Sequence, residues 1–379
     1  MKEVLIGLVV IIVLSLVGGF VYKQLGSTLG NFGIGGGDDI KLGPDGGIFI
    51  SKDGGRTWAS ISMTEGSPIR ENFVKTDAYG AEFHSSDENR VFIGTSGGFY
   101  SYNISTNALE VVGNISGMVQ SIAIDPTNNE RMYVATKTGS GGTILKSTRT
   151  DNFYEVYSTL GPNSVRSDNV TLVRVDPQNT SIVYAGTQLG LLLESKDFGE
   201  SWSVKKEFDE ALRVLTIARQ DSKVIYAVVG NSKIFKSVNS GETWQDISAS
   251  LATQGVTAIE SVSVSPRDIS QVYASTGSGL FRSTNAGASF LKVNLLSADE
   301  NPHVLQVALD TFRESVIYIG VGAQVHRTED AGVNWQVKTL PTSRKVSVLR
   351  VSPVNPNLII AGVRASQVVS APKSNQFGF

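Results

Sequence analysis

Cysteine is absent from the 379-residue chain. This excludes disulfide bonds, thiolate metal sites, a cysteine nucleophile and the lipidated cysteine of a lipoprotein. Histidine is nearly absent as well, because only His84, His303 and His326 occur, and their spacing matches no zinc-binding motif. The chain also lacks a P-loop and a strand-linked GxGxxG motif. We therefore expect no metal site and no bound cofactor.

Charge is sparse and nearly balanced. Charged residues make up 18% of the chain, and the formal net charge is -2. Such a chain has no basic field that could hold a nucleic-acid backbone. We therefore expect no nucleic-acid partner.

Proline is scarce, at 11 residues, whereas glycine is abundant, at 39 of 379. Collagen is excluded because the glycines follow no three-residue period, and disorder is excluded because aliphatic residues are plentiful. Glycines spread through a background of β-branched residues indicate many tight turns between strands. The composition predicts an all-β protein.

An apolar stretch lies close to the N-terminus. Val4 to Tyr22 are 19 residues without a charge, and a helix of this length measures about 28 Å, close to the hydrocarbon thickness of a bilayer. We predict that residues 1–23 form an uncleaved transmembrane signal anchor. A cleaved signal peptide is the alternative, although the stretch is long for one and its small-x-small cleavage site is poorly formed.

Residues 24–46 are Gly-rich and lack apolar periodicity, which predicts a flexible tether. The folded body, residues 47–371, would then lie outside the cytoplasm, at the cell surface or in the periplasm. One lysine flanks each end of the apolar stretch, so charge leaves the membrane orientation open. Residues 372–379 form a tail with two interpretations, a docking peptide or a disordered end.

An eight-residue box, close to S/T-x-D/N-x-G-x-T/S-W/F, recurs after the tether. Its five good copies start at Ser51, Ser195, Ser237, Ser283 and Thr328, and two weaker copies start at Ser101 and Ser147. The starts are 42 to 50 residues apart, which is typical of one propeller blade. The acidic or amide residue, the glycine and the aromatic residue of the good boxes are Asp53, Gly55, Trp58; Asp197, Gly199, Trp202; Asn239, Gly241, Trp244; Asn285, Gly287, Phe290; and Asp330, Gly332, Trp335.

A second motif alternates with the boxes. Each copy is a hydrophobic segment, a polar turn and a second hydrophobic segment, as in VRVDPQNTSIVYAGT at residues 173–187, and this pattern is typical of a β-hairpin. Seven such hairpins alternate with seven box-bearing hairpins, so we predict seven four-stranded blades of about 46 residues each. The chain begins with an outer hairpin and ends with an inner one. The two terminal hairpins should therefore complete one blade and close the ring.

The boxes are interpreted as structural turns. An Asp or Asn side chain can accept hydrogen bonds from backbone N–H groups of its own turn. Glycine adopts a positive φ without a steric penalty, and the aromatic residue buries a large apolar surface. We therefore expect the boxes to stabilise the fold rather than to catalyse a reaction.

In these boxes the sequence resembles the BNR or Asp-box propellers, over roughly residues 44–371. That group includes bacterial sialidases, sortilin-type receptors, xyloglucan-degrading glycosidases and the photosystem II assembly-factor family. The hairpin motif looks most like the xyloglucanase and assembly-factor branches, and this resemblance implies seven blades. The assembly-factor family also implies an arginine-lined surface, for which the scattered candidates are Arg166, Arg174, Arg213, Arg344 and Arg350.

Polar residues gather in the predicted connections between blades. These connections should lie on the face opposite the boxes and converge around the mouth of the central channel. The loops between the second and third strands are short, which disfavours a deep substrate cleft. The rim has two interpretations, a solvated surface or a surface that binds protein or glycan, with candidate residues Arg70, Arg166, Asp168, Arg213, Glu300, His303 and Arg344.

Enzymatic activity stays open, with the balance against it. A sialidase would carry an Arg-Ile-Pro-like segment before the first box, and the chain has none. Xyloglucan-type hydrolysis needs two carboxylates flanking a bond, and the resemblance implies a cleft between two propellers, whereas this chain has room for one. The carboxylates that could serve are Asp168, Asp209, Asp299 and Glu300.

Two functions of different classes follow. In the first, a membrane-anchored propeller outside the cytoplasm binds a protein partner, as an assembly factor, a receptor or a subunit of a surface complex. In the second, the propeller is a cell-surface protein that binds or hydrolyses carbohydrate.

Overall fold

A computed structural model describes residues 47–61, 73, 76–115, 117–139, 141–149, 152–160, 168–297 and 299–365. The predicted anchor, the tether and the C-terminal tail lie outside these residues. Within the described ranges, no helix is long and apolar enough to cross a membrane.

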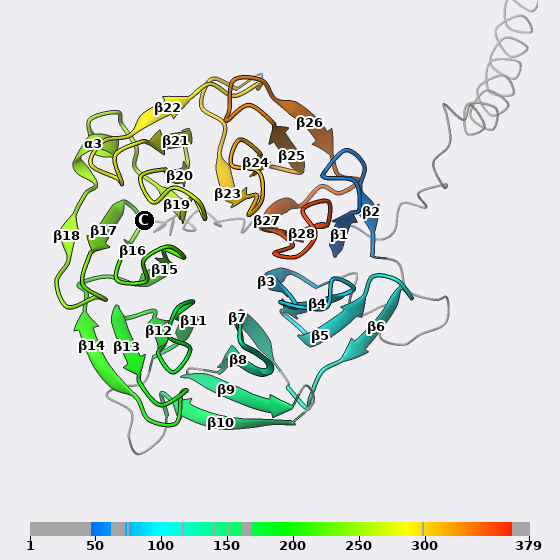
Figure 1. The fold of residues 1–379 in the computed structure, drawn as a ribbon, viewed down its shortest axis with the longest axis vertical. Coiled ribbons are helices and arrows are strands. Elements are labelled where there is room, and N and C mark those ends of the chain that lie inside the picture. The colour runs from blue at the N-terminus through cyan, green and yellow to red at the C-terminus, as the bar shows by residue number, and fades with distance from the viewer. Residues whose placement is uncertain are drawn as a thin grey trace, which may run out of the picture. The chain divides into compact units, whose positions relative to one another are not determined.

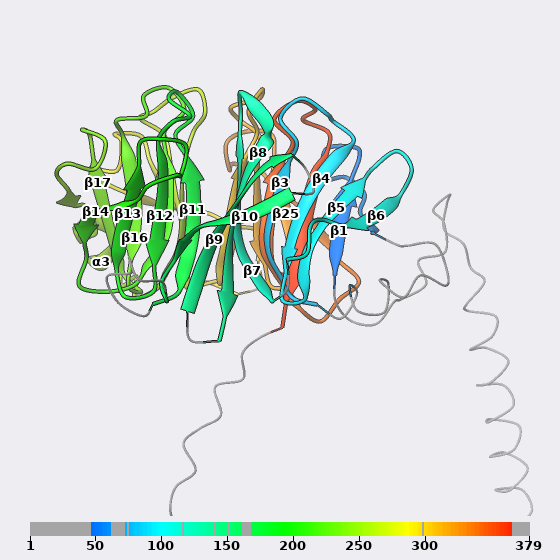
Figure 2. The same cartoon turned by 90° about the horizontal axis from the view of Figure 1, so that it is seen from below.

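The strands form seven four-stranded antiparallel sheets arranged in a ring, as Figure 1 shows. The centre of the ring, which the innermost strands surround, is called the central channel. Viewed edge-on, the strands run between two opposite faces that carry the loops (Figure 2). The all-β, seven-bladed propeller predicted from the repeats is therefore confirmed.

The first four blades follow one another in chain order, each with its innermost strand first. Their strands are β3 (Ala78–Phe83), β4 (Arg90–Thr95), β5 (Gly98–Asn103) and β6 (Ala108–Val111); β7 (Met118–Asp125), β8 (Asn128–Thr138), β9 (Gly141–Arg149) and β10 (Asn152–Ser158); β11 (Val170–Val175), β12 (Val183–Thr187), β13 (Leu191–Ser195) and β14 (Ser203–Glu207); and β15 (Leu212–Ile217), β16 (Ile225–Val229), β17 (Lys233–Ser237) and β18 (Gln245–Asp246).

A short helix, α3 (Ala249–Ala252), follows the fourth blade, and the last three blades complete the ring. Their strands are β19 (Ile259–Val264), β20 (Val272–Thr276), β21 (Gly279–Ser283) and β22 (Leu291–Val293); β23 (Val304–Leu309), β24 (Ile317–Val321), β25 (Gln324–Thr328) and β26 (Gln336–Thr339); and β27 (Lys345–Val351), β28 (Ile359–Arg364), β1 (Ile48–Ser51) and β2 (Ala59–Ser60).

Blade 7 closes the ring with strands from both ends of the chain. Its order is β27, β28, β1 and β2, and β1 pairs antiparallel with β28, with Phe49 opposite Ala361. Ring closure gives β1 and β28 a second neighbouring strand that each would otherwise lack. The predicted blade shared by the two termini is therefore confirmed.

Every inner strand has a β-bulge near its start, opposite the second strand of its blade. In β15, for example, Leu212 lies opposite Val229 and Val214 lies opposite Val228, which leaves Arg213 as the extra residue. A bulge redirects the extra side chain. The seven residues at this position are Tyr79, Gln120, Thr171, Arg213, Glu260, Leu305 and Ser347.

Glycine in the second strand lets neighbouring blades approach closely. A Cβ added at Gly94 would lie 2.5 Å from Cγ1 of Val119 in the next blade, and one added at Gly320 would lie 2.8 Å from Cγ1 of Val346. These distances are far below van der Waals contact. The glycine of the YAGT-like segments is therefore required by packing between blades.

The two sequence motifs contact each other across blade boundaries. The tyrosine of the hairpin motif donates its hydroxyl hydrogen to a backbone carbonyl in the box of the following blade, which fixes one blade against the next. The bonds run from Tyr133 to Phe198 (2.8 Å), Tyr184 to Ser240 (3.5 Å), Tyr226 to Ala286 (2.9 Å) and Tyr318 to Gly54 (3.0 Å).

The boxes use their polar side chains within their own turns. In the box at Ser195, Oδ1 of Asp197 accepts a hydrogen bond from the Ser201 backbone N–H at 2.9 Å, and Oγ of Ser195 accepts one from the Gly199 N–H at 2.8 Å. The indole of Trp202 donates to the Gly199 carbonyl at 2.9 Å. The hydrogen bonds to Asp197, chiefly those from Ser201, lower its pKa to about 2.

The residue before the box glycine also has a positive φ, which the sequence motif did not indicate. The angle is 60° at Phe198 and 55–58° at Ser240, Ala286 and Ala331. This conformation aims the carbonyl of that residue at the tyrosine of the preceding blade, at Phe198, Ser240 and Ala286.

Candidate binding surface around the central channel

The predicted rim residues separate into four groups. Arg70 and Arg166 lie outside the described residues. Asp168 and Arg344 stabilise the fold. Arg213 and His303 meet at the channel mouth, whereas Glu300 is exposed beside β22, where its backbone carbonyl accepts a hydrogen bond from Nζ of Lys292 at 3.1 Å.

Asp168 precedes β11 and is 3% exposed. Its carboxylate accepts hydrogen bonds from the backbone N–H groups of Asn169 at 2.7 Å and of Leu189 at 3.1 Å. It thus joins the start of the inner strand to the loop between β12 and β13. The side chain is committed to backbone groups of its own blade.

Arg344 lies in the connection before β27 and contributes to ring closure. Its Nη1 lies 2.7 Å from Oδ1 of Asp77, which precedes β3 of blade 1. The same carboxylate oxygen accepts a hydrogen bond from the backbone N–H of Ala365 at 2.8 Å. Asp77 therefore holds the end of blade 7 against the start of blade 1.

Arg213 and His303 are joined by Glu260, a residue that was absent from the predicted site. One oxygen of Glu260 lies 3.0 Å from Nη2 of Arg213, and the other lies 2.9 Å from Nε2 of His303. The three residues come from blades 4, 5 and 6. Arg213 also donates from Nη1 to the carbonyls of Gly230 and Ile259, so its main effect is to position Glu260.

Glu260 was missed because it lies inside a hydrophobic strand rather than in a polar connection. One signal could have revealed it. Arg213 and Glu260 occupy the same bulge position of consecutive inner strands. When the hairpin motifs of neighbouring repeats are aligned in sequence, these two residues fall at the same position, which predicts that they are neighbours in the ring.

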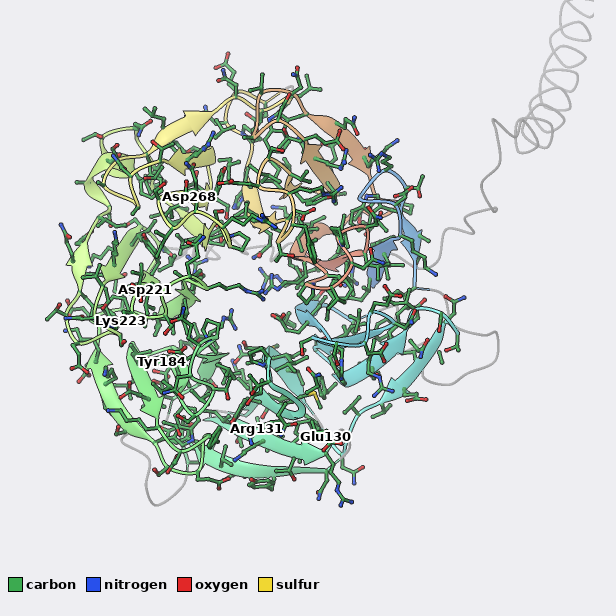
Figure 3. All side chains as sticks on the ribbon, viewed as in Figure 1. Glu130, Arg131, Tyr184, Asp221, Lys223 and Asp268 are labelled. Carbon is green, nitrogen blue, oxygen red and sulfur yellow. The ribbon has the colours of Figure 1, made fainter. Side chains whose placement is uncertain are left out.

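A second cluster of charges lies further along the inner strands, after the bulge position that Arg213 and Glu260 occupy. Arg174 is in β11 of blade 3, opposite the hairpin tyrosine Tyr184, and Arg350 is in β27 of blade 7, opposite Ile360, which takes the place of that tyrosine. Burial lowers the pKa of Arg174, and the charge of Arg350 lowers it further. Blades 3 and 7 are not neighbours, so this interaction runs across the channel. Figure 3 shows side chains projecting into the centre of the ring, whereas the labelled Arg131, Asp221 and Asp268 lie over the blades.

Both guanidinium groups are held by the channel wall. Arg174 donates from Nε to the Leu215 carbonyl at 3.2 Å and from Nη1 to Oγ of Ser121 at 2.9 Å. Nε of Arg350 lies 3.2 Å from Oε1 of Glu82 in blade 1. In the described part of the chain, no hydrogen bond from Nη2 of either arginine is present.

The channel interior has an excess of positive charge. At the position of Arg174 and Arg350, the other inner strands contribute one carboxylate, Glu82, and four uncharged residues. Burial, followed by the charge of Arg350, lowers the pKa of Arg174 to about 10. Arg174 therefore remains cationic at neutral pH. A bound anion would relieve the repulsion between Arg174 and Arg350 and bond their planar N–H groups.

The wall of the channel is stiffened by hydrogen bonds between blades. Hydroxyl groups on the inner strands donate to backbone carbonyls of the next inner strand, which limits the movement of one blade against another. These bonds run from Thr171 to Leu212 (2.7 Å), Thr216 to Val262 (2.7 Å), Ser263 to Val307 (3.3 Å) and Ser347 to Ala78 (2.9 Å).

The channel chemistry suits binding. The three carboxylates placed on the inner strands, Glu82, Asp125 and Glu260, are each paired with an arginine. Among the residues that the structure describes, no group of three or more His, Cys, Asp or Glu could hold a metal ion. Gln120 at the bulge of β7 has a buried amide oxygen, Oε1, without a hydrogen-bond partner among the described residues.

Similar folds occur in solved structures with different functions. A GH74 enzyme from Niastella koreensis is 18% identical with a TM-score of 0.60, and the match covers 76% of this chain and 51% of that one. The GH74 xyloglucanase from Xanthomonas campestris is 16% identical with a TM-score of 0.62, covering 81% and 52%. YCF48 bound to D1 peptide is 15% identical with a TM-score of 0.58, covering 76% and 94%.

This chain therefore spans about half the length of the two GH74 enzymes and nearly the whole length of YCF48. No protein-family profile matches the sequence, and no curated protein matches it. At these identities the similarity concerns the fold. The chain is a seven-bladed β-propeller of the architecture shared by the xyloglucanase and YCF48 branches that its hairpin motif resembles.

Proposed function

We propose that this protein is a protein-binding propeller that captures an acidic segment of its partner at the central channel. The observation that carries the proposal is the position of Arg174 and Arg350 on the inner strands of blades 3 and 7, at a level of the ring where the other inner strands supply one carboxylate, Glu82 of blade 1, which pairs with Arg350. A carboxylate group is the ligand that such a pair favours, because two parallel N–H bonds can form to it.

YCF48 supports this function by analogy, since a propeller with this fold is described as bound to a peptide. We further propose that the apolar stretch Val4–Tyr22 anchors the chain in a membrane, with the propeller outside the cytoplasm. The support for the anchor is the length and the lack of charge of that stretch.

The test compares the full chain with Arg350→Gln. A fluorescent peptide with four glutamates is titrated, and its all-glutamine counterpart serves as the peptide control. We expect the acidic peptide to bind at least about 10-fold more weakly to the variant, and its affinity for the unmodified chain to fall as salt rises. Crosslinking and capture from native membranes should recover a protein partner with the unmodified chain and should no longer recover that protein with Arg350→Gln.

A matched control variant is Arg219→Gln, which removes an exposed arginine from the turn between β15 and β16. It changes the net charge equally without touching the channel. Equal loss of binding in both variants would show only a general charge effect. Equal binding by the unmodified chain and Arg350→Gln, with unchanged thermal unfolding, would refute the proposal.

A further inference from the structure

A cavity of about 280 Å³ lies between the outer strands of blades 3 and 4. It borders β14 and β17, which lie toward the outside of the ring, whereas the channel is bordered by the inner strands (Figure 1). The cavity is thus separate from the arginine pair. Its lining residues are Lys206, Glu207, Phe208, Asp209, Val229, Lys233, Phe235, Glu242, Thr243 and Trp244.

Three aromatic rings form the apolar side of this cavity. The ring centres of Phe208 and Phe235 are 5.3 Å apart, and those of Phe208 and Trp244 are 5.4 Å apart with the rings nearly perpendicular. Phe208 is buried, whereas Phe235 and Trp244 are partly exposed. The indole N–H of Trp244 already donates to the Gly241 carbonyl. The rings therefore present apolar surface to the cavity.

The exposure of Phe235 is unusual for its position in the repeat. Phe49 in blade 7 and Phe281 in blade 5 likewise lie two residues before the box serine, and they are 2% and 1% exposed. The length of the outer strand does not account for this difference, because β18 of blade 4 and β2 of blade 7 each pair with their neighbour over two residues only. Blade 4 leaves an aromatic surface uncovered that the other two blades bury.

The polar side of the cavity carries charges of both signs, and two of them are held in place by residues outside the cavity. Glu242 is bonded by Lys205 at 2.5 Å, and Lys205 is itself fixed by Glu194 at 3.1 Å. Lys233 is bonded by Glu210 at 3.0 Å. Fixed donors and acceptors beside apolar rings are typical of small-ligand sites.

We propose that this cavity binds one pyranose unit of a neutral glycan. A pyranose has apolar C–H faces that stack on aromatic rings, and its hydroxyl groups both donate and accept hydrogen bonds. The two lysines can donate to these hydroxyls and the three carboxylates can accept from them. The volume of about 280 Å³ lies just below the usual range for drug-sized ligands, which starts at about 300 Å³, and this suits a single ring.

The nearly balanced charge favours an uncharged ligand. The lining contains three carboxylates and two ammonium groups, so a uronic acid or a strongly basic ligand would meet like charges as well as opposite ones. This site does not depend on the channel function, because its residues and those of the channel lie on different strands.

The test uses the full chain and the methyl glycosides of glucose, xylose, galactose and glucuronic acid, with N-acetylphenylalanine amide as a peptide-like probe. Binding is measured by saturation-transfer NMR and by tryptophan fluorescence. We expect at least one neutral glycoside to bind with a millimolar Kd, as is typical of a ligand of about a dozen heavy atoms, and the glucuronoside to bind more weakly.

Two cavity variants and two controls decide the outcome. Asp209→Ala and Phe235→Leu should each weaken glycoside binding by about 10-fold or more. Phe312→Leu, at an exposed aromatic residue in the turn after β23, and the channel variant Arg350→Gln should leave it unchanged. The proposal is overturned if no glycoside binds, if binding survives in both cavity variants, or if only the phenylalanine amide binds.

Discussion

A buried histidine should make the stability of the ring depend on pH in a defined window. His326 lies in β25, is 1% exposed and faces Ile319 and Val337 on the neighbouring strands. Its Nε2 lies 3.1 Å from Oε1 of Gln324, and its Nδ1 is buried without a hydrogen-bond partner among the described residues. Burial lowers the pKa of His326 to about 4.

The sign and size of the effect follow from linkage. Between pH 6.5 and about 4, the unfolded chain binds a proton at His326 and the folded chain does not, so the free energy of unfolding falls as the pH falls. The difference of about 2.5 pKa units corresponds to about 3 kcal/mol at 1.36 kcal/mol per unit. The loss is complete below pH 4 and absent above pH 7.

Urea denaturation from pH 7.5 to pH 4 measures this loss, and His326→Phe is the diagnostic variant. Phenylalanine already occupies the equivalent position in blades 5 and 7, at Phe281 and Phe49, where it is buried. The variant should lose about 3 kcal/mol less stability than the unmodified chain between these pH values. The exposed His303 provides the control, because His303→Gln leaves His326 in place and should retain the loss of about 3 kcal/mol that comes from His326. An unchanged slope in His326→Phe would refute the reasoning.

Two further predictions concern the boxes and the contact between blades. Asp197→Ala removes the acceptor for the Ser201 N–H and should lower the free energy of unfolding by about 1–3 kcal/mol, while the affinity for the acidic peptide stays unchanged. An Asp197→Ala variant that keeps its stability but loses peptide binding would contradict the structural role of the box. Gly94→Ala brings a methyl group to within 2.5 Å of Val119 and should destabilise the ring by about 1–3 kcal/mol in thermal or urea unfolding. Gly139→Ala is the control, because nothing lies within 4 Å of the added Cβ. Its φ of 61° should cost about 1 kcal/mol or less. Equal stability of Gly94→Ala and the unmodified chain would contradict the packing argument.

The candidate site was predicted only in part. Arg213 and His303 were both candidate residues, and each pairs with Glu260, which the prediction did not include. Asp168 was a candidate for binding, and the structure shows its carboxylate bonded to backbone N–H groups. Sequence reasoning looked for polar connections, whereas the bulges bring strand residues to the channel.

The sequence by itself determined the blade count, the order of strands in each blade and the closure of the ring. These features are encoded in short repeated segments, where alternating hydrophobic residues, turn residues and glycine act on their immediate neighbours. The blade shared by β1 and β28 follows from the same counting. The first segment of the chain is an outer hairpin without an inner one, and the last segment is an inner hairpin without an outer one. These two hairpins can complete a blade only by pairing with each other.

Only the tertiary structure decided which residues from different blades meet. Arg174 and Arg350 are 176 residues apart in the chain and interact because the ring places their strands on opposite sides of one channel. The aromatic cavity lies where Phe235 of blade 4 is partly exposed, whereas Phe49 and Phe281 at the same repeat position are buried. Contacts of this kind depend on the geometry of the ring and on small differences between one repeat and the others. A repeat pattern in the sequence contains only what the repeats share, so it does not predict these contacts.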